Sequence, residues 1–178
     1  MKVQSGCIIE VKYILRKDNE KGEILEIMDE HWPFKFLFGS GILLPTFEQN
    51  LEALEDGMHF KFSLSAEEAY GKHDVSKIVQ VFKEDIEEDH RYPIDNYEAG
   101  DFVNLSLGSA QQVSGVIHKI AKDYILVDGN HAMAGIDLHF EGQILNVRQA
   151  REDELLNSRY IEPNGIRSHS RLSEPPNQ

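Results

Sequence analysis

Residues 33–54 constrain the fold more than any other stretch of the sequence. Three phenylalanines alternate there as in a strand with one apolar face: Phe34, Phe36 and Phe38. A Gly-Ser-Gly break and a pair of leucines follow, and three apolar residues then lie at helical spacing: Phe47, Leu51 and Leu54. Pro45 suits the first position of this helix, and Gly57 suits a left-handed cap after its end. We therefore expect a strand, a turn and a short helix around one small apolar concavity.

The overall charge and the cysteine content exclude several classes of function. The chain has 178 residues, enough for one large domain or two small ones. Its 31 acidic and 18 basic residues give a net charge of -13, which repels a phosphate backbone and argues against a nucleic-acid partner. Cys7 is the single cysteine, so an intramolecular disulfide and a cysteine-based zinc site are excluded. We expect Cys7 to be a small core residue.

The sequence does not predict a membrane protein. Charged residues occur within the first twenty positions, so we expect no signal-peptide core there. No run approaches the ~20 apolar residues of a membrane-spanning helix. We therefore expect a cytoplasmic protein without a membrane partner.

Most of the remaining chain predicts short strands. The strands expected outside residues 33–54 and 75–127 are 7–15, 24–28, 59–64 and 138–147. The polar run 17–22 predicts a hairpin turn between the first two strands. Ser65 and Glu68 have capping-box spacing, which favours a short helical turn. Residues 151–160 predict a terminal helix, and the tail from residue 162 is expected to be disordered.

Residues 75–127 differ in character from both flanking parts. They begin with many charges and continue with strand-like runs at 103–107, 113–120 and 124–127, with a short helical segment near 82–89. We expect most of their apolar side chains to form a small core and a minority to be exposed: Val103, Leu105, Leu107, Val116, Ile120, Ile125 and Val127. Short strands with one central helix make the fold α+β.

The sequence contains no grouping that supports conventional catalysis. Gly39-Ser40-Gly41 lacks the residues of a phosphate loop, and no Ser-His-Asp or Cys-His pattern occurs. His131 and His139 would supply two ligands, too few for a zinc site, so we expect no metal and no cofactor. An apolar pocket can nevertheless catalyse rotation about an X–Pro amide, whose barrier is ~18–20 kcal/mol, by binding the twisted form best. Five aromatic residues suit such a pocket: Tyr13, Phe34, Phe47, Tyr70 and Phe140.

Four segments resemble the FKBP-type peptidyl-prolyl cis–trans isomerases. They are residues 33–39, the Leu43-Leu44 pair, residues 69–71 and residues 127–135. The last is similar to the SlyD-like subfamily, in which a small chaperone domain called insert-in-flap interrupts the isomerase domain. The resemblance implies an FKBP-like antiparallel sheet wrapped on a short helix. It implies an isomerase domain of residues 1–74 and 128–156, an insert domain of residues 75–127, and a flexible tail of residues 157–178.

The resemblance also assigns a substrate site, residue by residue. The positions that match the family's pocket are Tyr13, Leu25, Glu26, Phe34, Leu43, Leu44, Phe47, Tyr70, Ile78 and Phe140. The backbone N–H of Leu44 is expected to hold a substrate carbonyl. Glu26 replaces the usual aspartate, Phe47 replaces a tryptophan, and Gly142 stands where a β-branched residue would pack, which suggests a bulge or a close backbone approach. The tail lacks the family's nickel-binding cluster, so we do not expect a metal function.

Two hypotheses for function follow. In the first, the chain is a monomeric isomerase and folding chaperone, whose insert captures unfolded proline-containing polypeptides while the pocket rotates their X–Pro bonds. In the second, the replacements at Leu25, Glu26 and Phe47 leave a catalytically weak chaperone or a module that binds proline peptides.

Overall fold

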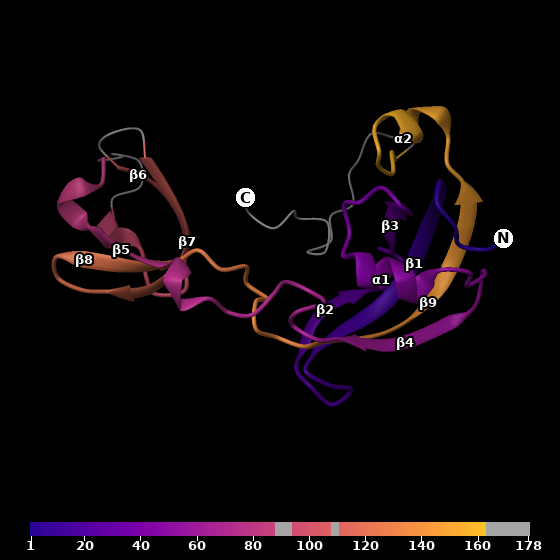
Figure 1. The fold of residues 1–178 in the computed structure, drawn as a ribbon, viewed down its shortest axis with the longest axis horizontal. Coiled ribbons are helices and arrows are strands. Elements are labelled where there is room, and N and C mark those ends of the chain that lie inside the picture. The colour runs from indigo at the N-terminus through magenta and orange to yellow at the C-terminus, as the bar shows by residue number, and fades with distance from the viewer. Residues whose placement is uncertain (88–93, 108–110, 163–178) are drawn as a thin grey trace. The chain divides into compact units, whose positions relative to one another are not determined.

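The computed structural model describes residues 1–87, 94–107 and 111–162. The chain divides into two compact units: unit 1 comprises residues 1–72 and 133–178, and unit 2 comprises residues 73–132. Both are built on antiparallel sheets with few helices (Figure 1). In the described part of the chain, the helices are too short to cross a membrane.

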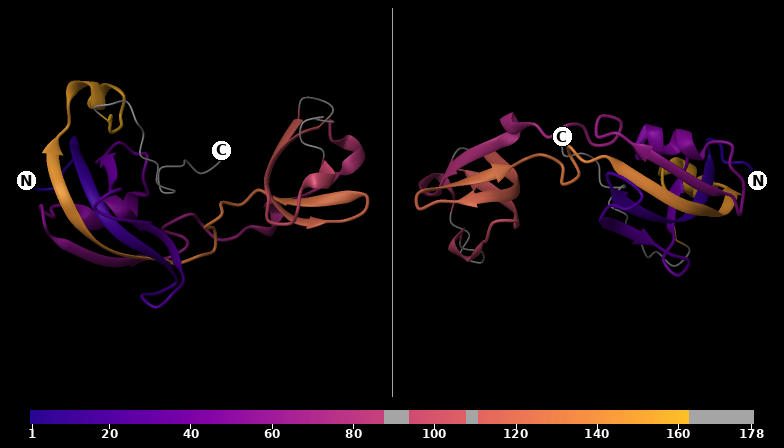
Figure 2. Two further views of the ribbon diagram at one scale, coloured as in Figure 1. Left: turned by 180° about the vertical axis from the view of Figure 1, so that it is seen from behind. Right: turned by 90° about the horizontal axis from the view of Figure 1, so that it is seen from below.

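Unit 1 is a five-stranded antiparallel sheet. Its strands are β1 (Cys7–Lys17), β2 (Ile24–Met28), β3 (Phe34–Leu37), β4 (His59–Leu64) and β9 (Leu138–Gln149). The strand order is β2-β1-β9-β4, and β3 also pairs with β1. β9 therefore lies between β1 and β4, which both precede unit 2 in the sequence, and the views of Figure 2 show it in this place. The four predicted strands outside residues 33–54 and 75–127, and the one at 34–38, are all confirmed.

One face of this sheet is covered by the helix α1 (Pro45–Leu51), which buries Phe47 and Leu51 (Figure 1). Pro45 is its first residue, as the sequence predicts. The predicted end is wrong, because the helix stops at Leu51 and Ala53 adopts the left-handed conformation with φ +64°. Gly57 has φ +82° but lies in the turn before β4.

The residues after β4 form the predicted short helical turn, in which the Ala69 N–H donates to the Ser65 carbonyl at 3.0 Å. Within it, Glu68 Oε2 accepts hydrogen bonds from the Ser65 N–H at 2.9 Å and from the Ser65 hydroxyl at 2.7 Å. The predicted capping-box contacts are thus present, although they cap a single turn.

The C-terminal end of unit 1 is held by a buried charge. Helix α2 (Glu152–Leu156) is shorter than predicted, and Glu154 within it is fully buried. The Arg148 guanidinium donates to both Glu154 carboxylate oxygens, at 2.7 and 2.6 Å. Burial raises the pKa of Glu154, but the hydrogen bonds from Arg148 and from backbone N–H groups outweigh it and lower that pKa to about 2.

Residues 157–162, expected in a flexible tail, make defined contacts. The Tyr160 hydroxyl donates to Glu162 at 2.8 Å, and the Lys35 ammonium lies 3.3 Å from the Glu162 carboxylate and over the Tyr160 ring. The rest of the predicted tail, residues 163–178, lies outside the described residues.

Unit 2 is a four-stranded antiparallel sheet in the order β5-β8-β7-β6. Its strands are β5 (Ile78–Phe82), β6 (Phe102–Leu107), β7 (Gln111–Ile120) and β8 (Tyr124–Asp128), and its 3-10 turns are Val75–Lys77, Lys83–Asp85 and Ile94–Asn96. β5 was not predicted, because its short apolar run is embedded among charged residues. The helical segment expected at 82–89 is only the turn Lys83–Asp85, and residues 88 and 89 lie outside the described part.

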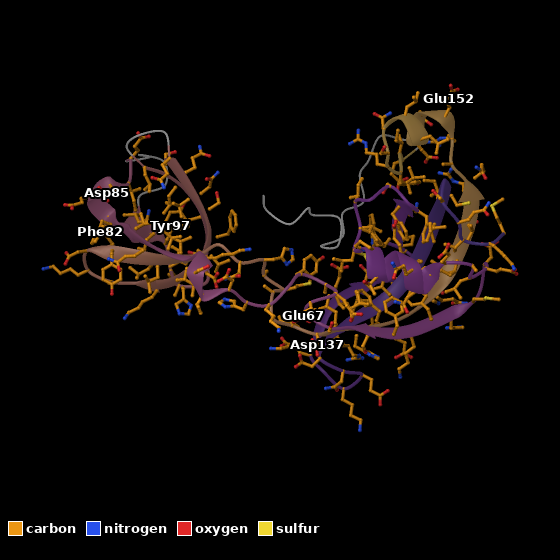
Figure 3. The ribbon with its side chains drawn as sticks, viewed as in Figure 1. Glu67, Phe82, Asp85, Tyr97, Asp137 and Glu152 are labelled. Carbon is orange, nitrogen blue, oxygen red and sulfur yellow. The ribbon has the colours of Figure 1, made fainter. Side chains whose placement is uncertain are left out.

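The core of unit 2 differs from the prediction in one respect. A minority of seven apolar residues was expected to be exposed, but the structure exposes none of them. Val103, Leu105, Ile125 and Val127 are buried, and Leu107, Val116 and Ile120 are half-buried. The large apolar side chains that are exposed in the described part of unit 2 are instead Val75, Val79, Phe82, at 46%, and Phe102, at 60%. Phe82 is labelled in Figure 3.

Candidate functional site

Tyr13 lies at the centre of an aromatic cluster in unit 1. Its ring makes edge contacts with Phe34, Phe47 and Phe140, at centroid distances of 6.2, 6.4 and 5.9 Å. The Phe47 and Phe140 rings also contact each other at 5.1 Å. Four residues from β1, β3, α1 and β9 thus meet, all of them nearly or fully buried. Side chains fill the space between α1 and the sheet in Figure 3.

Two further phenylalanines belong to this cluster and were not among the predicted site residues. Phe36 stacks on Phe34 at 5.1 Å and lies 6.0 Å from Phe47. Phe62 stacks on Phe140 at 5.2 Å. The alternation of phenylalanines in β3 and β4 was the signal for both, because alternate residues in a strand share a face.

A hydrogen bond joins Tyr13 to Glu26, and both are predicted site residues. The Tyr13 hydroxyl donates to Glu26 Oε1. Glu26 pairs across the strands with Leu15, two residues from Tyr13, and its side chain is half-buried. The Glu26 carboxylate therefore holds the tyrosine hydroxyl and fixes the orientation of the ring's polar end.

The two leucines before α1 take different positions. Leu43 is buried in the core, while Leu44 is half-buried and is the N-cap residue of the helix. The Leu44 carbonyl accepts from the Glu48 N–H at 3.2 Å. Across residues 1–87, 94–107 and 111–162, the Leu44 N–H donates to no protein oxygen. A half-buried N–H without a protein acceptor is available to a ligand.

Tyr70 reaches the cluster from the turn after β4. Its side chain is half-buried and packs against the apolar core of unit 1. Gly71 follows it with φ +79°, and the Gly71 carbonyl accepts from the Gly135 N–H at 2.8 Å. Met133, two residues before Gly135, is buried in the same core. The motif residues 69–71 and 133–135, distant in sequence, are thus neighbours.

Four of the predicted site residues in unit 1 are half-buried, and we call them the rim: Leu25, Glu26, Leu44 and Tyr70. Nine of the ten predicted site residues therefore belong either to the buried aromatic and aliphatic core of unit 1 or to its rim. Ile78, the tenth, is the half-buried first residue of β5 in unit 2, and its assignment stays a prediction.

Gly142 allows the strands around Tyr13 to come close together. It pairs with Tyr13 on β1 and with Phe60 on β4. A Cβ added at Gly142 would lie 2.3 Å from the Lys12 carbonyl oxygen, 2.5 Å from the Phe60 ring and 2.8 Å from the Tyr13 Cβ. The sequence suggested either a bulge or a close backbone approach at Gly142, and the structure shows the close approach. The bulge in the β1–β9 ladder lies elsewhere, at Glu10 and Val11.

Comparison with known proteins assigns the family. The family model described as FKBP-type peptidyl-prolyl cis-trans isomerase matches residues 1–85. The chain is 30% identical over 156 residues to the SlyD isomerase of Treponema pallidum, covering 87% of this chain and 84% of that protein. The chain belongs to the SlyD family of FKBP-type peptidyl-prolyl cis–trans isomerases. It is also 31% identical to SlyD of Yersinia pestis and 30% identical to SlyD of Escherichia coli K12, each over 155 residues that cover 87% of this chain and 75% of the relative.

The family confirms the predicted activity, so the chain is an isomerase of X–Pro peptide bonds. This reaction needs neither a nucleophile nor a metal ion, because no covalent bond is made or broken. Within the described residues, no group of three or more histidine, cysteine, aspartate and glutamate side chains could hold a metal ion.

Proposed function

We propose that the X–Pro bond rotates against the rim and the aromatic cluster of unit 1. The planar amide has charge-separated character that water stabilises, so apolar surroundings weaken it and favour the twisted form. The rings around Tyr13 are held by mutual edge contacts and by the hydrogen bond to Glu26. Such a rigid apolar wall can fit the twisted imide better than either planar form, which is the requirement for catalysis.

The Leu44 N–H is the proposed donor to the substrate. A peptide that lays its proline on the rim brings a carbonyl next to the residues that begin α1. Donation from Leu44 would fix the peptide while the X–Pro bond stays free to turn. The observation that carries this assignment is the half-buried N–H of Leu44, which has no protein acceptor in the described part of the chain.

Unit 2 is the proposed client-binding part. One side of its sheet carries apolar residues that do not enter the core, because strand neighbours alternate between the two faces. We call these residues the outer face: Ile78, Phe82, Phe102, Val116, Tyr124 and Leu126. Cross-strand pairs join Phe82 to Tyr124 and Phe102 to Val116. A half-exposed apolar sheet face of this kind suits weak, unspecific contact with unfolded chains.

Capture by unit 2 would raise the concentration of X–Pro bonds near the rim without a new catalytic contact. Isomerisation of such bonds takes tens of seconds when uncatalysed and limits the folding of many proteins. The proposed clients are therefore unfolded or partly folded proline-containing polypeptides.

The double variant Phe82→Ser/Phe102→Ser tests this division of labour. We expect its kcat/KM on a short X–Pro peptide to stay within about twofold of wild type, because the peptide is held by the rim alone. Its acceleration of a proline-limited refolding reaction should fall about tenfold or more, which corresponds to ~1.4 kcal/mol of lost client binding.

Leu155→Ser/Leu156→Ser is the matched control, since these exposed leucines, 47% and 79% accessible, lie in unit 1 away from the rim residues. The control should leave both assays unchanged. An equal loss on peptide and protein substrates in the Phe82/Phe102 variant, or no loss on either, would contradict client capture by the outer face.

A further inference from the structure

Glu48 makes a contact that the family's known chemistry does not require. It lies in the first turn of α1, and its side chain turns back toward the preceding loop. Glu48 Oε1 accepts a hydrogen bond from the Gly39 backbone N–H at 3.0 Å. Gly39 lies two residues after the end of β3 and begins the loop of residues 39–44. The Glu48 carboxylate, in the helix that follows the loop, therefore holds the first residue of the loop.

The loop depends on such a contact because its own sequence gives it little rigidity. Gly39 and Gly41 both have left-handed backbones, with φ +78° and +75°, and glycine leaves the unfolded loop many alternatives. Ile42 is exposed, so it adds little packing. The loop is fixed at Phe38, whose N–H donates to the Cys7 carbonyl at 2.9 Å, and at Leu43, which is buried. Between these points, Glu48 supplies the polar anchor.

The loop ends at Leu44, whose N–H is the proposed substrate donor. The direction of that N–H is set by the peptide plane between Leu43 and Leu44, at the junction of loop and helix. Glu48 acts at both ends of the loop, because its backbone N–H donates to the Leu44 carbonyl at 3.2 Å while its side chain holds Gly39.

We propose that Glu48 is a positioning residue for isomerisation, whose carboxylate holds residues 39–44 so that the Leu44 N–H points at the substrate carbonyl. This inference rests on the proposed role of Leu44. It assigns Glu48 no contact with substrate and no proton transfer.

The surroundings of Glu48 give the proposal a distinctive pH dependence. Burial raises the pKa of Glu48 above its ordinary value, and the hydrogen bond from Gly39 offsets only part of that rise. Residues 39–44 contain no titratable group, and the charged neighbour one turn along α1 is Glu52, a further acid. As the pH falls through this raised pKa, Glu48 becomes a neutral and weaker acceptor. The loop should then loosen at a pH where ordinary glutamates are still ionised.

Two substitutions in the full-length chain test the proposal, with kcat and KM measured on a short X–Pro peptide between about pH 4.5 and 8. Glu48→Gln keeps an oxygen acceptor for Gly39 but does not titrate. We expect it to retain kcat/KM within about threefold at pH 7.5 and to lack the acid-side decline that the proposal predicts for wild type. Glu48→Ala should lower kcat/KM about tenfold at pH 7.5, the size expected for one lost hydrogen bond to a charged group, and by less on the acid side, where the wild-type carboxylate is itself protonated.

Several outcomes would overturn the proposal. One is a Glu48→Ala variant with wild-type kcat/KM at pH 7.5, and another is an acid-side decline that persists unchanged in Glu48→Gln. The glutamine variant keeps the test decisive if the alanine variant does not fold. Tyr70→Ala is measured in parallel: if it loses activity while both Glu48 variants behave as wild type, the positioning role alone fails. If Tyr70→Ala is also silent, the rim is not the reaction site and both proposals fail.

Discussion

Gly142→Ala is expected to destabilise unit 1 by about 3 kcal/mol or more, at the upper end of the cost of overpacking a core. The added methyl group would meet a backbone oxygen of Lys12 at 2.3 Å and the Cβ of Tyr13 at 2.8 Å, and neither can rotate away as a flexible side chain would. The strands β1 and β9 must therefore move apart. Since Tyr13 is the centre of the aromatic cluster, peptide isomerisation should fall together with stability.

The measurement for this variant is native-state hydrogen exchange of the β1 and β9 amides, which reports unit 1 separately from unit 2. Glu141→Ala is the matched control, because Glu141 is the exposed neighbour on the same strand. We expect the control to stay within about 0.5 kcal/mol of wild type. Wild-type protection of β1 and β9 in Gly142→Ala would show that the close approach at this glycine is not required.

Arg148→Met is expected to destabilise unit 1 by roughly 3 kcal/mol, the cost of leaving a buried carboxylate without its main partner. Glu154 is fully buried and receives two hydrogen bonds from the Arg148 guanidinium. Arg151 would remain 3.5 Å away, but its own side chain is largely exposed. Arg151→Met is therefore the matched control, and its cost should stay below about 1 kcal/mol.

The cost of losing Arg148 should depend on pH with a definite sign. The pKa of Glu154 is about 2 in the folded wild type, against an ordinary value of 4.5. A lowered pKa contributes stability that is complete above pH ~4.5 and is lost as the pH falls toward about 2. Urea unfolding at pH 7 and pH 3 should therefore show a smaller difference between wild type and Arg148→Met at pH 3. An equal difference at both values would contradict the charge-based explanation.

The strands of unit 1 could be predicted because each carries its own pattern. β1 alternates apolar and polar residues, and the alternating phenylalanines of β3 and β4 reappear as stacked rings in the cluster. The start of α1 was predictable from Pro45, but its end was not. Ala53 takes the left-handed conformation that glycine normally favours, so tertiary contacts decide there: the Ala53 N–H donates to the Val3 carbonyl at 3.0 Å.

The features missed by the sequence depend on contacts between distant residues. β5 has only five residues, and its pairing with β8 stabilises it more than its own pattern does. Residues 157–162 were expected to be flexible because the resemblance placed them in the tail. Their order comes from Lys35 and Arg148, which lie against Tyr160. The Glu48–Gly39 contact likewise has no sequence signature, because a glutamate in a first helical turn is common for electrostatic reasons alone.

The central claim is that X–Pro rotation takes place at the rim of the unit 1 cluster, and one measurement tests it most directly. The cis/trans exchange rate of a short X–Pro peptide is measured by NMR exchange spectroscopy with wild type, Tyr70→Ala and Tyr124→Ala. Both tyrosines are half-buried, but Tyr70 belongs to the rim and Tyr124 to the outer face of unit 2. The account predicts a loss of about tenfold or more for Tyr70→Ala in protein that is still folded at the assay temperature, and wild-type exchange for Tyr124→Ala. Wild-type exchange with Tyr70→Ala, or a loss confined to Tyr124→Ala, would contradict it.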